Sequence, residues 1–75
     1  MAGYSTLTAR EIREANSNLL GVKLGRFCLA RDIPVADAAE YLHVSRVTVY
    51  AWFRGRADVS GHHRDAVIEL LKKLA

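Results

Sequence analysis

Apolar residues recur along this chain at the spacing of α-helices. Four of them fall at positions i, i+4, i+7 and i+8 of one helix: Leu20, Leu24, Phe27 and Cys28. Pro34 stops that helix, because the residue before a proline is driven out of helical geometry. Gly21 and Gly25 interrupt its interior, and glycines in such places often let a second helix approach closely. The pattern predicts an all-α, compact four- to five-helix domain.

Three more helices are predicted downstream, over residues 35–42, 45–53 and about 62–74. Gly55 ends the second of these as a C-terminal glycine does, and residues 56–61 form a loop. The apolar positions expected to face inward in the first two of these helices are Ala38, Ala39, Leu42, Val49, Trp52 and Phe53. In the last helix, one face carries Val67, Leu70, Leu71 and Leu74.

Residues 1–17 are predicted to be an N-terminal extension, with a mobile start over the first seven residues and then a short helix. Residues 18–75 form the main domain. Thr8 and Glu11 make a capping box that would start the short helix, which runs to about Asn16. An alternative is one bent helix, because helical apolar spacing continues across the polar residues 16–18, at Ile12, Ala15, Leu19 and Val22.

The segment 35–54 has the pattern of a helix-turn-helix, two short helices joined by a tight turn. Ala39 is small where the two helices would cross, and the side chain of Val44 is expected to pack inside the turn. Ser45 is a ready N-cap for the second helix. Since Val49, Trp52 and Phe53 anchor the inner side of that helix, its opposite side must face outward.

The outward side of the second helix carries Val47 and Ala51, which is unusual for a face that meets only water. In a DNA major groove, small apolar groups can touch thymine methyls, and an arginine such as Arg46 can pair with guanine. The residues predicted to contact bases are Arg46, Val47, Thr48, Tyr50 and Ala51. Those predicted to contact phosphates are Ser45, Arg54, Arg56, His62, His63 and Arg64. For the last three, exposed residues at a helix start are an equal alternative.

The same segment resembles the helix-turn-helix of the lambda-repressor-like (Cro/XRE) superfamily, and small phage and prophage regulators in particular. The matching positions are Ala39, Leu42, Val44, Ser45, Val49 and the ending Trp52-Phe53-Arg54-Gly55. The resemblance covers residues 19–74 and implies DNA binding. Two positions differ from the family. His43 stands where a turn glycine is usual, which demands a positive φ, and Val35 replaces a glutamine that often touches a phosphate.

Charge and cysteine usage narrow the chemistry further. The chain has 11 Lys and Arg against 8 Asp and Glu, and this net charge of +3 permits a nucleic-acid partner without establishing one. Cys28 is the only cysteine, so no intrachain disulfide can form, and we expect it in the core. Without a cleavable signal segment, it suggests the reducing cytosol of a bacterial host. No apolar run approaches the roughly 20 residues of a membrane helix.

Metal and catalytic chemistry find no support in the sequence. His62 and His63 are adjacent, and neither Cys28 nor His43 completes a ligand spacing, so we expect no metal. No nucleophile is paired with a base, so we expect no enzymatic activity and no cofactor.

The leading hypothesis is a sequence-specific, double-stranded DNA-binding transcriptional regulator from a phage or prophage. One module offers few base contacts, so a homodimer on DNA is expected to read two half-sites. Its dimer surface would come from the N-terminal extension or from the last helix, through Val67, Ile68, Leu71 and Leu74. Two alternatives remain open. One is a DNA-architectural or packaging factor, such as an excisionase or a terminase small subunit. The other is a phage protein-interaction module that binds a host protein and uses the helix-turn-helix only as scaffold.

Overall fold

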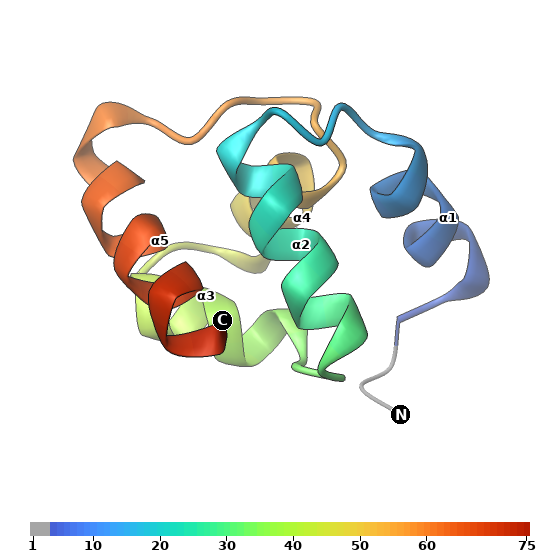
Figure 1. Cartoon of the computed structure of the whole chain (residues 1–75), viewed down its shortest axis with the longest axis horizontal. Coiled ribbons are helices and arrows are strands. Elements are labelled where there is room, and N and C mark those ends of the chain that lie inside the picture. The colour runs from blue at the N-terminus through green and yellow to red at the C-terminus, as the bar shows by residue number, and fades with distance from the viewer. Residues whose placement is uncertain (1–3) are drawn as a thin grey trace.

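Five α-helices form the fold in the computed structural model, which describes residues 4–75, and no strand occurs among those residues. The helices are α1 (Thr6–Glu14), α2 (Leu20–Ala30), α3 (Val35–Leu42), α4 (Arg46–Phe53) and α5 (Gly61–Leu74). Helix α2 crosses the middle of the molecule and contacts α1, α4 and α5 (Figure 1). The predicted all-α class is confirmed. None of these helices combines the length and apolar composition needed to cross a bilayer.

The first helix begins one turn earlier than its sequence pattern predicts. Ser5 is the N-cap, because its hydroxyl oxygen accepts the backbone N–H of Thr8 at 3.0 Å. The capping box predicted at Thr8 and Glu11 is therefore wrong, and Thr8 is a buried residue of the helix. The predicted mobile start is wrong over residues 4–7, because Thr6 and Leu7 belong to α1 and the hydroxyl of Tyr4 donates to the carbonyl oxygen of Ile33 at 2.7 Å. Its first three residues lie outside the described residues.

A break separates α1 from α2, so the alternative of one bent helix is wrong. Ala15 is extended, with ψ 163°, and the amide N–H of Asn18 donates to the side-chain oxygen of Asn16 at 3.0 Å. This local hydrogen bond competes with helical pairing. Ile12 and Val22 still reach the interior from the two separate helices, and both are fully buried.

The two glycines of α2 are where α4 packs closest. A Cβ atom at Gly21 would lie 2.7 Å from the Cβ of Trp52, and one at Gly25 would lie 2.8 Å from the Cγ of Phe53. Both distances are shorter than side chains tolerate. The predicted close approach of a second helix is thus confirmed, and α4 is that helix.

The remaining helix ends follow local signals. Helix α2 ends at Ala30, before Asp32 in the left-handed region with φ 59°, and Pro34 serves as the N-cap of α3. Helix α3 occupies the predicted residues, α4 starts at Arg46, one residue after the predicted start, and Gly55, with φ 73°, follows α4. Helix α5 starts at Gly61, one residue before the predicted start.

The core is drawn from all five helices and from the segment before α5. Its buried residues are Ile12, Val22, Leu24, Cys28, Val35, Ala38, Ala39, Leu42, Val49, Trp52, Phe53, Val59 and Val67. The prediction that Cys28 packs in the core is confirmed, and burial raises the pKa of its thiol to about 11. Val67 is fully buried, so it cannot belong to the dimer surface predicted on the last helix, whereas Ile68 remains exposed.

Candidate nucleic-acid interface

The connection between α3 and α4 fixes how α4 leaves the core. His43 adopts φ 57° and ψ 43°, the left-handed conformation expected where a glycine is usual. The N–H of Val44 then donates to the carbonyl oxygen of Ala39 at 3.1 Å, which closes the end of α3. Histidine tolerates this conformation better than most residues do.

Ser45 starts α4 with its side chain. Its hydroxyl oxygen accepts the backbone N–H of Thr48 at 3.2 Å and lies 3.0 Å from the hydroxyl of Thr48. The N-cap prediction is confirmed. Ser45 is also predicted from the sequence to contact a phosphate. Its hydroxyl would then have to hydrogen-bond to both the helix and the phosphate.

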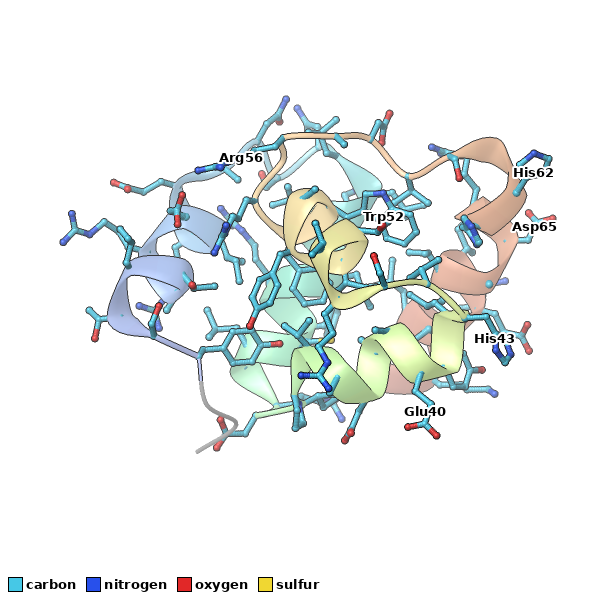
Figure 2. The ribbon with its side chains drawn as sticks, turned by 180° about the vertical axis from the view of Figure 1, so that it is seen from behind. Glu40, His43, Trp52, Arg56, His62 and Asp65 are labelled. Carbon is cyan, nitrogen blue, oxygen red and sulfur yellow. The ribbon has the colours of Figure 1, made fainter. Side chains whose placement is uncertain are left out.

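The two sides of α4 differ sharply in burial. Val49, Trp52 and Phe53 are buried against the core, while Arg46 is exposed and Val47 is 79% exposed. Thr48, Tyr50 and Ala51 are half-buried at the flanks. In the view from behind, α4 lies in front of α2 (Figure 2). Arg46 and Val47 are therefore the most accessible of the five residues predicted to contact bases, whereas Tyr50 also packs against the core.

The two arginines after α4 are held by α1. The guanidinium of Arg56 donates to Glu11 Oε2 at 2.9 Å, and Arg54 Nε lies 3.5 Å from Glu11 Oε1. Arg54 also donates to the Thr8 hydroxyl at 3.2 Å, and its guanidinium lies over the ring of Tyr50, 5.1 Å from the centroid. Arg54 and Arg56, which are both predicted to contact phosphates, thus interact with the same carboxylate, that of Glu11, in this structure.

Burial distinguishes these arginines. The Arg56 side chain is 65% exposed and is labelled beside α1 in Figure 2, whereas that of Arg54 is 26% exposed. Arg54 Nε is buried and makes no hydrogen bond. The Arg56 side chain can therefore reorient toward a phosphate more freely. Arg54 could do so only if its contacts with α1 were broken.

Sequence reasoning missed Thr8 and Glu11 as members of this site. The contacts join residues 45 and 46 positions apart in the chain. No spacing rule within a helix or turn reports such a distance. The one available signal is that Thr8 and Glu11 lie three residues apart, which puts them on the same side of one helix.

The three residues predicted as a second phosphate cluster do not come together. The His63 ring packs against Trp52, with centroids 5.6 Å apart and planes tilted by 51°. Arg64 lines a depression with Asn18 and Asp58, toward the start of α2. His62 is exposed (Figure 2). These side chains diverge from the start of α5, so they do not form one anion site in this structure.

Within residues 4–75, no three His, Cys, Asp or Glu side chains gather closely enough to hold a metal ion. Comparison with protein-family models, with curated proteins and with solved structures found no match to this chain. Any functional assignment therefore depends on the geometry described above and on the sequence pattern.

Proposed function

We propose that the chain is a sequence-specific, double-stranded DNA-binding transcriptional regulator of phage or prophage origin. In this proposal α3 and α4 act as a helix-turn-helix, and α4 enters the major groove. The main observation that supports this proposal is the exposure of one side of α4. Val47 is 79% exposed beside the exposed Arg46, while the opposite side of the helix is buried in the core. An isolated, exposed valine beside an arginine suits thymine methyl and guanine contacts.

Phosphate contacts would come from the end of α4. Arg56 is the more accessible cation, and Arg54 would join it if a phosphate displaced Glu11. Such contacts position the helix without reading sequence. One helix reads few base pairs, so two copies on half-sites about one helical turn apart complete the proposal.

The experiment is selection of bound sequences from random duplex DNA at a stated salt concentration. A shared motif with two symmetric halves is expected. Arg46→Ala should lose about 1–3 kcal/mol on the selected site and relax specificity at one position. Arg31→Ala is the control, because it removes one positive charge from an exposed position at the end of α2, and we expect it to keep the motif. No enrichment over bulk DNA would refute the proposal.

A second candidate is the module that binds a host protein. The observation that favours it is the neutralisation of Arg54 and Arg56 by Glu11, which reduces the free positive charge beside α4. Replacing Arg46 and Arg54 with glutamate separates the candidates. A DNA-binding protein loses its function, whereas a protein-binding module that uses another face keeps it.

A further inference from the structure

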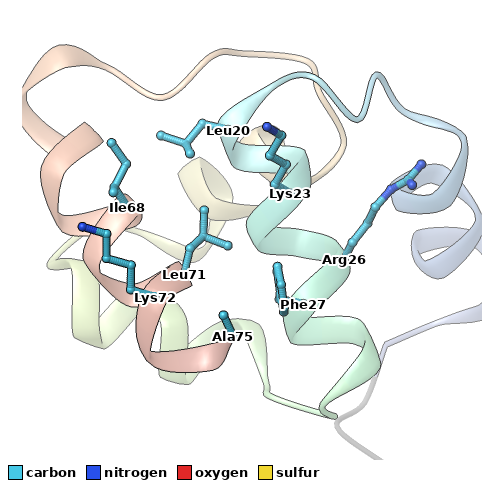
Figure 3. Close-up of a pocket in the computed structure, with 8 residues that line it drawn as sticks. All are labelled: Leu20, Lys23, Arg26, Phe27, Ile68, Leu71, Lys72 and Ala75. Carbon is cyan, nitrogen blue, oxygen red and sulfur yellow. The ribbon is translucent and has the colours of Figure 1, made fainter.

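An apolar groove lies between α2 and α5, on the face of the molecule away from the outward side of α4 (Figure 3). Its volume is about 470 Å³. Its apolar walls are made by Leu20, Phe27, Ile68 and Leu71, and its rim by Lys23, Arg26 and Lys72. The stripe predicted from sequence on α2 is therefore only partly core. Leu24 and Cys28 are fully buried, but Leu20 and Phe27 are half-buried and face this groove.

The rim carries positive charge that nothing in the described contacts cancels. The described ion pairs join Glu11 to Arg54 and Arg56, so neither of them involves a rim residue. Arg26 donates to the backbone carbonyl of Arg13, which leaves its charge uncompensated. The neighbouring depression, which Lys23 also lines, contains Arg64 and the carboxylate of Asp58, so it adds no further net charge. The groove is thus complementary to a negatively charged surface.

The shape of the groove suits a helix. Its walls are residues 20–27 of α2 and the end of α5 from residue 68, with Ala75 just after it, and eight helical residues span roughly 10 Å, about two turns. A helix in a groove binds through apolar side chains at i, i+3 or i+4 and i+7, which is two turns of sequence. Apolar anchors along the middle and carboxylates on both sides would match the walls and the rim.

We propose that this groove is the docking site for an acidic amphipathic helix of a partner protein. A second copy of this chain fits poorly, because a twofold interface would set the rim cations of one copy against those of the other. A membrane also fits poorly. The apolar side chains line a depression between two helices, and Ile68 is only 37% exposed, so no apolar wedge stands out to enter a bilayer.

The docking site is independent of DNA binding. The rim residues Lys23 and Lys72 line the groove between α2 and α5 (Figure 3), whereas Arg46 and Val47 are exposed residues of α4 and do not line it. The test therefore needs no DNA, and its failure would leave the proposed function untouched.

The probe is a fluorescein-labelled helical peptide of about three turns, with leucines at i, i+3, i+4 and i+7 and glutamates between them. The control peptide has the same sequence with lysine in place of each glutamate. Fluorescence anisotropy against the full chain should show saturable, micromolar binding of the acidic peptide alone. Equal binding of the lysine peptide, or no binding of the acidic one, would overturn the proposal.

Charge reversal on the protein locates the site. The double variant Lys23→Glu and Lys72→Glu should weaken binding about tenfold, since each reversal alters an exposed pairing. Lys72→Glu alone should weaken binding severalfold, and Lys73→Glu, which changes the net charge by the same amount, is the matched control for that single variant. That lysine is the next residue of the same helix, but its ammonium donates to the Tyr41 hydroxyl at 2.7 Å, on the α3 side. Equal weakening by the control would overturn the site assignment.

Ile68→Gln tests the apolar wall at an exposed position that should not disturb folding, as circular dichroism can verify. It should weaken the acidic peptide severalfold. Two results would assign the groove to another occupant and overturn the proposal. One is a dimer in sedimentation that Ile68→Gln abolishes. The other is binding to phosphatidylglycerol vesicles that depends on Lys23 and Lys72 when the peptide does not bind.

Discussion

Replacing Glu11 with glutamine removes the carboxylate that Arg54 and Arg56 share. If these arginines contact phosphates in the proposed complex, DNA must compete with Glu11 for them. Glu11→Gln should then bind DNA more tightly than the parent chain, even though it is remote from α4 in sequence. The variant also keeps the size of the side chain, so the packing of α1 changes little.

The magnitude follows from the exposure of the two pairs. Arg56 is 65% exposed at 2.9 Å from the carboxylate, and Arg54 is 26% exposed at 3.5 Å. Ion pairs at exposed sites contribute about 0.2–1 kcal/mol each. Releasing both therefore makes about 0.4–2 kcal/mol available, which corresponds to roughly a 2- to 30-fold gain in affinity. The same amount should be lost from the free energy of unfolding.

The assay is fluorescence anisotropy with the selected duplex between about 50 and 200 mM salt. Two freed arginines should steepen the salt dependence, because each new phosphate contact adds about 0.9 to the slope of log K against log salt. Glu14→Gln is the control, since it removes one negative charge from an exposed site on the same helix. An equal gain in both variants would refute competition at the arginines and leave only a general charge effect.

Three further predictions concern stability. Gly21→Ala should cost about 1–2 kcal/mol in urea unfolding, because the overpacking penalty against Trp52 exceeds the gain in helix propensity. Gly61→Ala, with open space around its Cβ position, should be neutral or stabilising, and similar losses in both would contradict the packing argument. His43→Gly should gain up to about 1 kcal/mol in guanidinium unfolding, since it relieves the left-handed strain; a loss would show that the imidazole itself stabilises the turn. For Cys28, burial raises the thiol pKa from 9.0 to about 11, so the unfolded chain loses this proton first. The stability that the protonated thiol contributes is present below pH 9 and is lost as the pH rises toward 11. Cys28→Ala should therefore show a shallower alkaline fall of the thermal midpoint by circular dichroism, and an unchanged profile would contradict the assignment.

The region from α3 to α4 was predictable because its signals are local. Ser45 is the N-cap residue, Gly55 follows the last helical residues, and the apolar spacing lies within single helices. His43 was singled out because the family that the segment resembles usually has a glycine in the turn, and its φ of 57° agrees with that expectation. Such features are decided by residues a few positions apart, so a sequence pattern can report them.

The N-terminal region was harder to predict because a distant contact decides the role of each residue there. Ser5 and Thr8 are both suitable N-caps, and they are three residues apart. The hydroxyl of Thr8 is instead used by Arg54, 46 positions away, while Ser5 takes the cap. In the same way, Glu11 looks like the second half of a capping box but serves as the partner of Arg56. Choosing between these roles requires knowing where α1 packs.

The orientation of the outward side of α4 is determined by α2. With no Cβ at Gly21 and Gly25, the backbone and side-chain stems of Trp52 and Phe53 rest directly on α2. Such a contact leaves little room for α4 to rotate, and a rotation of one residue position, 100°, would replace Val47 with a neighbour on the outward side. Helix α2 also supplies one wall of the apolar groove. The direction of the side chains proposed to contact bases is therefore set by two glycines that lie outside the motif. The helix that carries these glycines, α2, also separates the two surfaces that are proposed to bind partners.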